Sequence, residues 1–164
     1  MRFVPTLLFC LLGSSAAAAE CDRWTASMQE EEVGPLMTAG ICMPANSGNP
    51  DFRHELFIQC AGEGHLWIRY IPFVDEGYPP GGDQGYETEI KFSLGEEIFT
   101  EPARYEDMDG AMAMDTTVDA PLISAMMRQE QVLVSDTKDK VPGTTFTLNG
   151  AAEALKALIK TCKP

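Results

Sequence analysis

The residues of this chain best suited to acid–base chemistry are its two histidines, His54 and His65. An imidazole titrates near neutral pH, so either one beside a serine or a carboxylate would favour hydrolysis. His54 and Glu55 match the first half of the HExxH zinc motif, but Ile58 stands where the second histidine is required, and that motif needs a helix. The chain contains no GxSxG nucleophile turn. We therefore interpret the histidines as polar positions in paired strands.

A second candidate is Asp107-Met108-Asp109-Gly110, which is similar to the start of a calcium-binding loop. An EF-hand requires a glutamate at the twelfth position, where this chain has Val118. The Asp-Gly pair is also typical of a two-residue hairpin turn, because both central positions of that turn need positive φ. The sequence therefore predicts a hairpin turn at Asp109 and Gly110, and neither a metal nor a cofactor is expected.

The other residues that could take part in catalysis or in metal binding are carboxylates and methionines. Paired carboxylates for glycoside hydrolysis stay open as an alternative, because their separation depends on the fold. Four methionines would suit copper or an adaptable binding surface if they were exposed: Met112, Met114, Met126 and Met127. Methionine is usually buried, so these side chains are predicted to fill the core.

The first residues and the charge indicate an exported protein. Residues 1–19 contain one arginine, a short apolar run and closing alanines, which is typical of a signal peptide cleaved after Ala19. Cleavage would leave one disulfide-stapled β-rich domain over 20–164, in the periplasm or secreted. Loss of Arg2 brings the formal net charge from −13 to −14. Strong negative charge favours a cationic protein as the partner, and the alternative interpretation is that acidity only keeps the protein soluble. Nucleic acid is not expected, because basic residues are few and scattered, and no later apolar run is long enough for a membrane span.

Four cysteines follow the leader: Cys21, Cys42, Cys60 and Cys162. An even number in an exported chain predicts two disulfides, and the absence of CxxC spacing argues against zinc. Three pairings are open. The sequence favours a bridge from Cys21 to Cys162 that ties the two ends together, with Cys42 joined to Cys60 on a neighbouring strand.

Both histidines lie in a segment that alternates like a β-hairpin. Apolar and polar positions alternate from Arg53 to Cys60 and from His65 to Ile71, and the glycine-containing turn Ala61 to Gly64 separates the two runs. Tyr86 to Leu94 is the clearest further strand, with one apolar and one polar face. Weaker patterns predict strands at 24–28, 36–43, 98–99, 103–108, 111–115, 131–136 and 144–148.

Two helices are expected late in the chain. One is predicted from a cap at Asp119 to Glu130, with Pro121 in its first turn, and the other follows Gly150 and carries an apolar stripe as far as Cys162. The expected fold class is therefore mainly β (α+β): an antiparallel β-sandwich or curled sheet with two helices near the C-terminus.

The segment Pro72 to Gly85 is predicted to be a long loop, because it contains three prolines and four glycines. Long loops in compact domains tend to be functional, and aromatic and acidic side chains suit insertion into the cleft of a basic protein. The candidate binding residues are Phe73, Asp75, Glu76, Tyr78 and Asp83. A mobile surface loop is the alternative interpretation.

The C-terminal run FTLNGAAEALKALIKTC, together with the leader, Trp24 and the cysteine layout, resembles small exported proteins of α-proteobacteria of the invasion-associated locus B type. Small, acidic, disulfide-bonded periplasmic proteins that inhibit lysozyme-like hydrolases are similar in kind. Those proteins often have a Ser-Gly element followed shortly by tyrosine, whereas Ser47-Gly48 is followed here by Asn49 and Pro50. Neither resemblance transfers a functional residue to this chain.

Export, strong negative charge and the lack of a catalytic motif lead to one preferred expectation. The protein is expected to be non-enzymatic and periplasmic, and to bind, and in the stronger form of the hypothesis inhibit, a basic lysozyme-like cell-wall hydrolase or another envelope partner. The alternatives are an envelope or host-interaction factor without a hydrolase target, and a small periplasmic hydrolase that uses carboxylates or a histidine.

Overall fold

The structure is a computed structural model that describes residues 21–31, 34–45, 52–73 and 79–163; the expected leader lies outside these ranges. The strands are β1 (Thr25–Glu31), β2 (Gly34–Pro44), β3 (Arg53–Gly62), β4 (His65–Ile71), β5 (Glu87–Leu94), β6 (Glu97–Glu106), β7 (Ala111–Thr117), β8 (Gln131–Asp136) and β9 (Thr144–Thr147). The helices are the 3-10 helix η1 (Pro80–Gly82), α1 (Pro121–Met126) and α2 (Ala151–Cys162). No helix in these ranges is long and apolar enough to cross a membrane.

The strands form one open antiparallel sheet in the order β1-β2-β3-β4-β7-β6-β5-β8-β9. The central hairpin expected from alternation is β3 and β4, and its partner on the other side is β7. The mainly-β prediction is thus confirmed in its curled-sheet form. Helix α2 lies near the C-terminus as expected, while α1 lies between β7 and β8.

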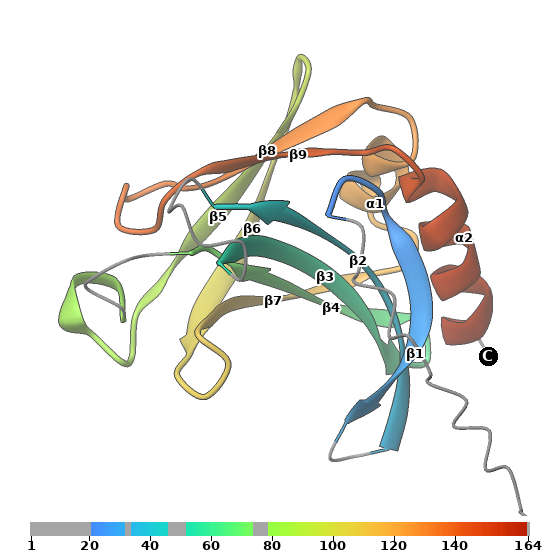
Figure 1. The fold of residues 1–164 in the computed structure, drawn as a ribbon, viewed down its shortest axis with the longest axis horizontal. Coiled ribbons are helices and arrows are strands. Elements are labelled where there is room, and N and C mark those ends of the chain that lie inside the picture. The colour runs from blue at the N-terminus through green and yellow to red at the C-terminus, as the bar shows by residue number, and fades with distance from the viewer. Residues whose placement is uncertain (1–20, 32–33, 46–51, 74–78, 164) are drawn as a thin grey trace, which may run out of the picture.

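The sheet curls so that its last strands cover its first half. Figure 1 shows β8 and β9 lying across β2 and β3. The ring of Phe146 in β9 meets the ring of Tyr70 in β4 edge-on, with centroids 6.1 Å apart. The Tyr70 hydroxyl donates to the carbonyl oxygen of Pro142 and lies 2.9 Å from the Thr144 hydroxyl, and burial raises its pKa to about 12. These contacts fix the curl, because a buried hydroxyl without partners would be costly.

The apolar faces of the strands and helices meet in this interior. Met112, Met114 and Met126 are at most 2% exposed, and Met127 packs partly buried against the core. The prediction that the methionines fill the core is confirmed.

Helix α2 packs its apolar stripe against the core face of β1, β2 and β3 (Figure 1). Gly150 caps it with φ of 82°, and an added Cβ would lie 2.9 Å from the carbonyl oxygen of Trp24. The Trp24 indole N–H donates to the carbonyl oxygen of Thr147 at 2.9 Å. The close approach at Gly150 therefore joins the segment before β1 to the segment after β9.

The disulfides differ from the pairing that the sequence favours. Cys21 is bonded to Cys42, and Cys60 is bonded to Cys162. A bridge from Cys42 to Cys60 is excluded by the register of β2 and β3: Cys42 is opposite Glu55, near the other end of the ladder from Cys60. Cys60 instead lies on the core side beneath α2, where it pins the last turn of the helix.

The short strand predicted at 98–99 and the strand predicted at 103–108 are one element, β6. Pro102 lies within it opposite Glu89 and does not interrupt the pairing with β5. The helix expected from Asp119 to Glu130 is also shorter than predicted. Its N-cap is Ala120 and it ends at Met126, so Asp119 is not its cap.

The turn between β6 and β7 is a four-residue connection, 107–110, closed by the pair Glu106 and Ala111. Only Gly110 has positive φ, 61°, so the two-residue turn predicted for Asp109 and Gly110 is wrong. Four-residue hairpin loops are usually built on a turn that needs one left-handed residue, which Gly110 supplies.

Candidate functional site

The expected binding loop is described only at its two ends. Asp75, Glu76 and Tyr78 lie outside the described residues. The ring of Phe73 stacks on Phe52 with centroids 4.5 Å apart, so Phe73 packs against a neighbour and is not a projecting tip.

At the other end of this segment, Asp83 is exposed and forms a local turn. Its carboxylate accepts a hydrogen bond of 2.9 Å from the backbone N–H of Gly85. No contact in the described structure joins Asp83 to Phe73, so the structure does not assemble these two candidate residues into one site.

The two histidines lie at opposite ends of the central hairpin. His54 is the second residue of β3, opposite Met43, and its Nδ1 accepts a hydrogen bond of 3.0 Å from the backbone N–H of Phe73. Burial lowers the pKa of His54. His65 begins β4, is exposed and pairs with Thr117. Within the described ranges, no three His, Cys, Asp or Glu side chains are grouped to hold a metal ion.

A different surface gathers polar side chains: the face of β1 to β7 that points away from the core, which we call the outer face. Cross-strand register places Gln59 opposite Trp67, and Phe57 opposite Arg69, on the central hairpin. Shallow grooves follow one another across this face from β1 to β5, each sharing residues with the next. The outer face is therefore the candidate functional site.

A hydrogen-bonded network forms the floor of the largest of these grooves, which has a volume of about 300 Å³. The Gln59 side chain is 4% exposed; its amide N–H group donates to Glu31 at 2.9 Å and to Thr38 at 3.2 Å. Arg69 donates to the Gln59 carbonyl oxygen at 2.9 Å and to Glu106 at 3.1 Å. The side-chain amide of Gln59 uses both its nitrogen and its oxygen in this network, which fixes its orientation.

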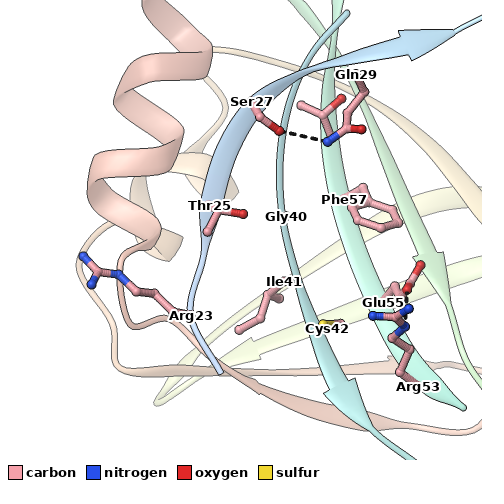
Figure 2. A pocket seen from close by; sticks show the side chains of 11 residues that line it. Arg23, Thr25, Ser27, Gln29, Gly40, Ile41, Cys42, Arg53, Glu55 and Phe57 are labelled. Atoms are coloured by element: carbon pink, nitrogen blue, oxygen red, sulfur yellow. Dashed lines mark hydrogen bonds and ion pairs between the residues drawn. The ribbon is translucent and has the colours of Figure 1, made fainter. Parts of the chain in front are cut away.

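Gly40 in β2 is paired with Phe57 in β3, and both are labelled in Figure 2. A Cβ atom at Gly40 would overlap one edge of the Phe57 ring, so glycine allows the ring to approach the strand this closely. Gln29 and Thr38 flank it and line the grooves on both sides. On the same face, Arg53 pairs with Glu55 at 3.2 Å; burial raises the pKa of Glu55, although Arg53 opposes the shift.

At the far end of the network, the turn between β6 and β7 carries Met108, whose side chain is 95% exposed. Asp107 and Asp109 flank it, and both are exposed. The base of the turn is held by the ion pair of Arg69 with Glu106, and Asp109 lies 3.7 Å from the same guanidinium. We call residues 107–110 the Met108 tip.

The outer face beside the tip is acidic. A groove of about 280 Å³ over β5, β6 and β7 is lined by the carboxylates of Glu87 and Asp115 and by Arg104. Ala113 in β7, which is paired with Arg104 in β6, also lines this groove with its small side chain. Together with the tip, this end of the face presents more carboxylates than cations.

Sequence reasoning did not identify these residues as a site. The sequence pattern places Trp67 and Arg69 on one face of a strand. Glu106 and Asp109 reach Arg69 because β7 pairs with both β4 and β6, which no local pattern reveals. Gly40 was the one available signal, because an isolated glycine in a strand often marks close approach of another group.

Neither protein-family models, curated proteins nor solved structures give a match to this chain. The assignment of function therefore depends on the geometry of the outer face.

Proposed function

We propose that this is a non-enzymatic envelope protein that binds a cationic protein, with a basic lysozyme-like cell-wall hydrolase as the preferred partner. The observation that carries the proposal is Met108, 95% exposed between two aspartates at the tip of a hairpin. A formal net charge of −13 and the leader pattern support it.

An exposed methionine on a fixed turn is a suitable anchor for a protein partner. Its unbranched, polarisable side chain adapts to irregular apolar pockets. Because the ion pair of Arg69 with Glu106 holds the base of the tip, little backbone conformational entropy is lost when the tip binds a partner. The tip thus has the role that the sequence assigned to Pro72 to Gly85: an apolar anchor with carboxylates around it.

The carboxylates beside the anchor supply attraction to a basic surface. Asp107 and Asp109 lie on the tip, and Glu87 and Asp115 line the adjacent groove. Complementary charge raises the rate of encounter and falls in effect as salt rises. Inhibition follows if the tip enters the substrate cleft of a hydrolase, and a hydrolase bound outside its cleft would remain active. The alternative is an envelope or host-interaction factor whose partner is not a hydrolase.

The test measures affinity for a cationic lysozyme and its lytic activity at low and at physiological salt. Met108→Ser should weaken binding about tenfold, as expected for loss of a buried apolar anchor. The matched control is Met28→Ser, which changes another exposed methionine, on β1, 54% exposed. Absence of binding and unaffected lysis at low salt would refute the hydrolase proposal, and equal effects of the two substitutions would refute the role of the tip.

The charge contribution has its own matched pair. Asp107→Asn should reduce the association rate at low salt, whereas Glu96→Gln, in the exposed turn between β5 and β6, removes the same charge from another hairpin. An equal loss in both variants would mean that net charge alone attracts the partner and that no acidic surface is specific.

A further inference from the structure

The opposite end of the outer face differs from the acidic end in charge. The two grooves on either side of Phe57 are lined by three arginines, Arg23, Arg53 and Arg69, and by three carboxylates, Glu31, Glu55 and Asp109. Their formal charges sum to zero, or to −1 without Arg23, whose side chain points away from Phe57 in Figure 2. In a chain of charge −13, this is a nearly neutral, densely polar surface.

We propose that this part of the outer face is a binding site for a neutral oligosaccharide, with the Phe57 ring as its stacking platform. One edge of the ring, Cδ1 and Cε1, lies against Gly40, and the ring lines the grooves on both sides. A pyranose has an apolar face of C–H groups, which carry partial positive charge and match the negative face of an aromatic ring. The inference goes beyond the protein partner proposed above and does not depend on it.

The polar groups around the ring match a ligand that bears hydroxyls. Amide, guanidinium and carboxylate side chains present pairs of donors or acceptors in one plane, as adjacent sugar hydroxyls require. Gln29 lies beside the ring with its amide nitrogen 2.8 Å from the Ser27 hydroxyl, and the Arg53 pair with Glu55 lies on the other side (Figure 2). These side chains are held in place before a ligand arrives, which lowers the entropy cost of binding.

The buried amide of Gln59 is a second, independent observation. A glutamine that is 4% exposed on the outer side of a sheet loses hydration, and three hydrogen bonds are needed to compensate. An apolar residue at position 59 would cover the sheet without burying a polar group, and a buried polar group that lacks a partner costs free energy. What the network achieves is a fixed orientation of Glu31 and Arg69 on the walls of the 300 Å³ groove.

Other occupants fit less well. A polyanion would meet the carboxylates of Glu31, Glu55 and Asp109, and a lysine-rich peptide would meet Arg53 and Arg69. An extended peptide that adds a strand requires a sheet edge, whereas β2 and β3 are paired on both sides. A neutral ligand with many hydroxyls avoids each of these conflicts.

The test titrates the protein with N-acetylglucosamine trimer and with maltotriose, followed by NMR shifts of backbone amides in β2 and β3 and by calorimetry. At least one trimer should bind, and its affinity should change less than about twofold between low and high salt, because the ligand is uncharged. Phe57→Leu keeps an apolar side chain and should weaken binding about tenfold, whereas Phe57→Tyr should keep it within about threefold.

The control is Phe52→Ala, which removes another exposed aromatic ring, 41% exposed, that lies outside these grooves. No binding of either trimer, or equal affinity of wild type and Phe57→Leu, would overturn the inference; so would binding of a lysine pentapeptide, with no trimer bound, at the same amides. Met108→Ser should leave trimer affinity unchanged, so failure here and failure of the lysozyme experiment are separate results.

Discussion

Replacing Asp136 by asparagine should destabilise the protein by about 3 kcal/mol. Asp136 ends β8 and is 3% exposed. Its carboxylate accepts five hydrogen bonds, from the hydroxyls of Tyr86 and Thr88 and from the backbone N–H groups of Lys138, Lys140 and Val141. These bonds fix the connection between β8 and β9. This connection includes Pro142, whose carbonyl oxygen accepts the hydrogen bond from the Tyr70 hydroxyl.

The magnitude follows from the donors. Asparagine has the same shape but only one acceptor oxygen, so its NH₂ group must face at least one backbone N–H in either orientation. One unsatisfied buried N–H costs about 1–3 kcal/mol, and the remaining bonds lose their charge-assisted strength. A loss of about 3 kcal/mol corresponds to a fall of roughly 10 °C in Tm for a domain of this size.

The pH dependence gives a second readout of the same carboxylate. Burial alone would raise the pKa of Asp136, but the hydrogen bonds from Thr88, Lys138, Tyr86 and Lys140 outweigh it and lower the pKa below the ordinary value of 3.8. The stabilisation is therefore complete above about pH 4 and is lost as the pH falls through the lowered pKa. The pKa values of Glu55 and Glu101 are raised by burial and act in the opposite sense, so only the difference between wild type and variant isolates Asp136.

The measurements are urea unfolding followed by tryptophan fluorescence, and Tm between pH 2 and 7 as a difference from wild type. Asp139→Asn is the control, because Asp139 is exposed in the same connection and its φ of 55° suits asparagine equally well. A loss below about 1 kcal/mol for Asp136→Asn, or an acid profile parallel to that of wild type, would refute the account.

Two further predictions concern the junction of the chain ends. Gly150→Ala should lower the free energy of unfolding by about 2 kcal/mol or more in thermal unfolding, because position 150 combines positive φ with a close contact to Trp24. The control is Gly95→Ala, where φ is also positive but there is more space, and it should cost about 1 kcal/mol. Equal losses in the two variants would contradict a role for the contact with Trp24. Replacing Cys60 and Cys162, which are 102 residues apart, by serines should lower the free energy of unfolding in urea by about 4–5 kcal/mol. The same change at Cys21 and Cys42, which are 21 residues apart, should cost about 3 kcal/mol. A larger loss from the shorter loop would contradict the loop-closure argument.

Local patterns were sufficient for most of the strands. The bounds of β4 and β8 are those predicted from the sequence, because buried and more exposed positions alternate along both strands. Pro102 lies between the two strands predicted at 98–99 and 103–108. Proline normally interrupts a ladder, whereas here it pairs with Glu89 without a break and the two strands are one. The residue type of Asp119 predicts a cap, but Pro121 is the first helical residue and α1 starts one residue later than expected.

Non-local information was needed for the disulfides and for the candidate site. The pairing of Cys42 with Cys60 was reasonable for neighbouring strands, yet only the register shows that these residues are far apart along the ladder. The candidate site on the outer face also depends on the pairing of strands that are distant in the sequence. Arg69 is a polar position of an alternating strand in the sequence, and its partners Glu106 and Gln59 come from strands on both sides of β4.

Arg69 connects the two proposed binding regions of the outer face. Its guanidinium donates to Gln59, beneath the groove beside Phe57, and to Glu106, at the base of the Met108 tip. It also lies 5.9 Å from the centre of the Trp67 ring and 3.7 Å from the Asp109 carboxylate, so one guanidinium contacts a neutral amide, two carboxylates and an aromatic ring. A lysine could not make these contacts together, because its ammonium is a point charge without a fork. The neutral groove and the acidic tip are therefore parts of one rigid surface, whose geometry is set by a single side chain from the central hairpin.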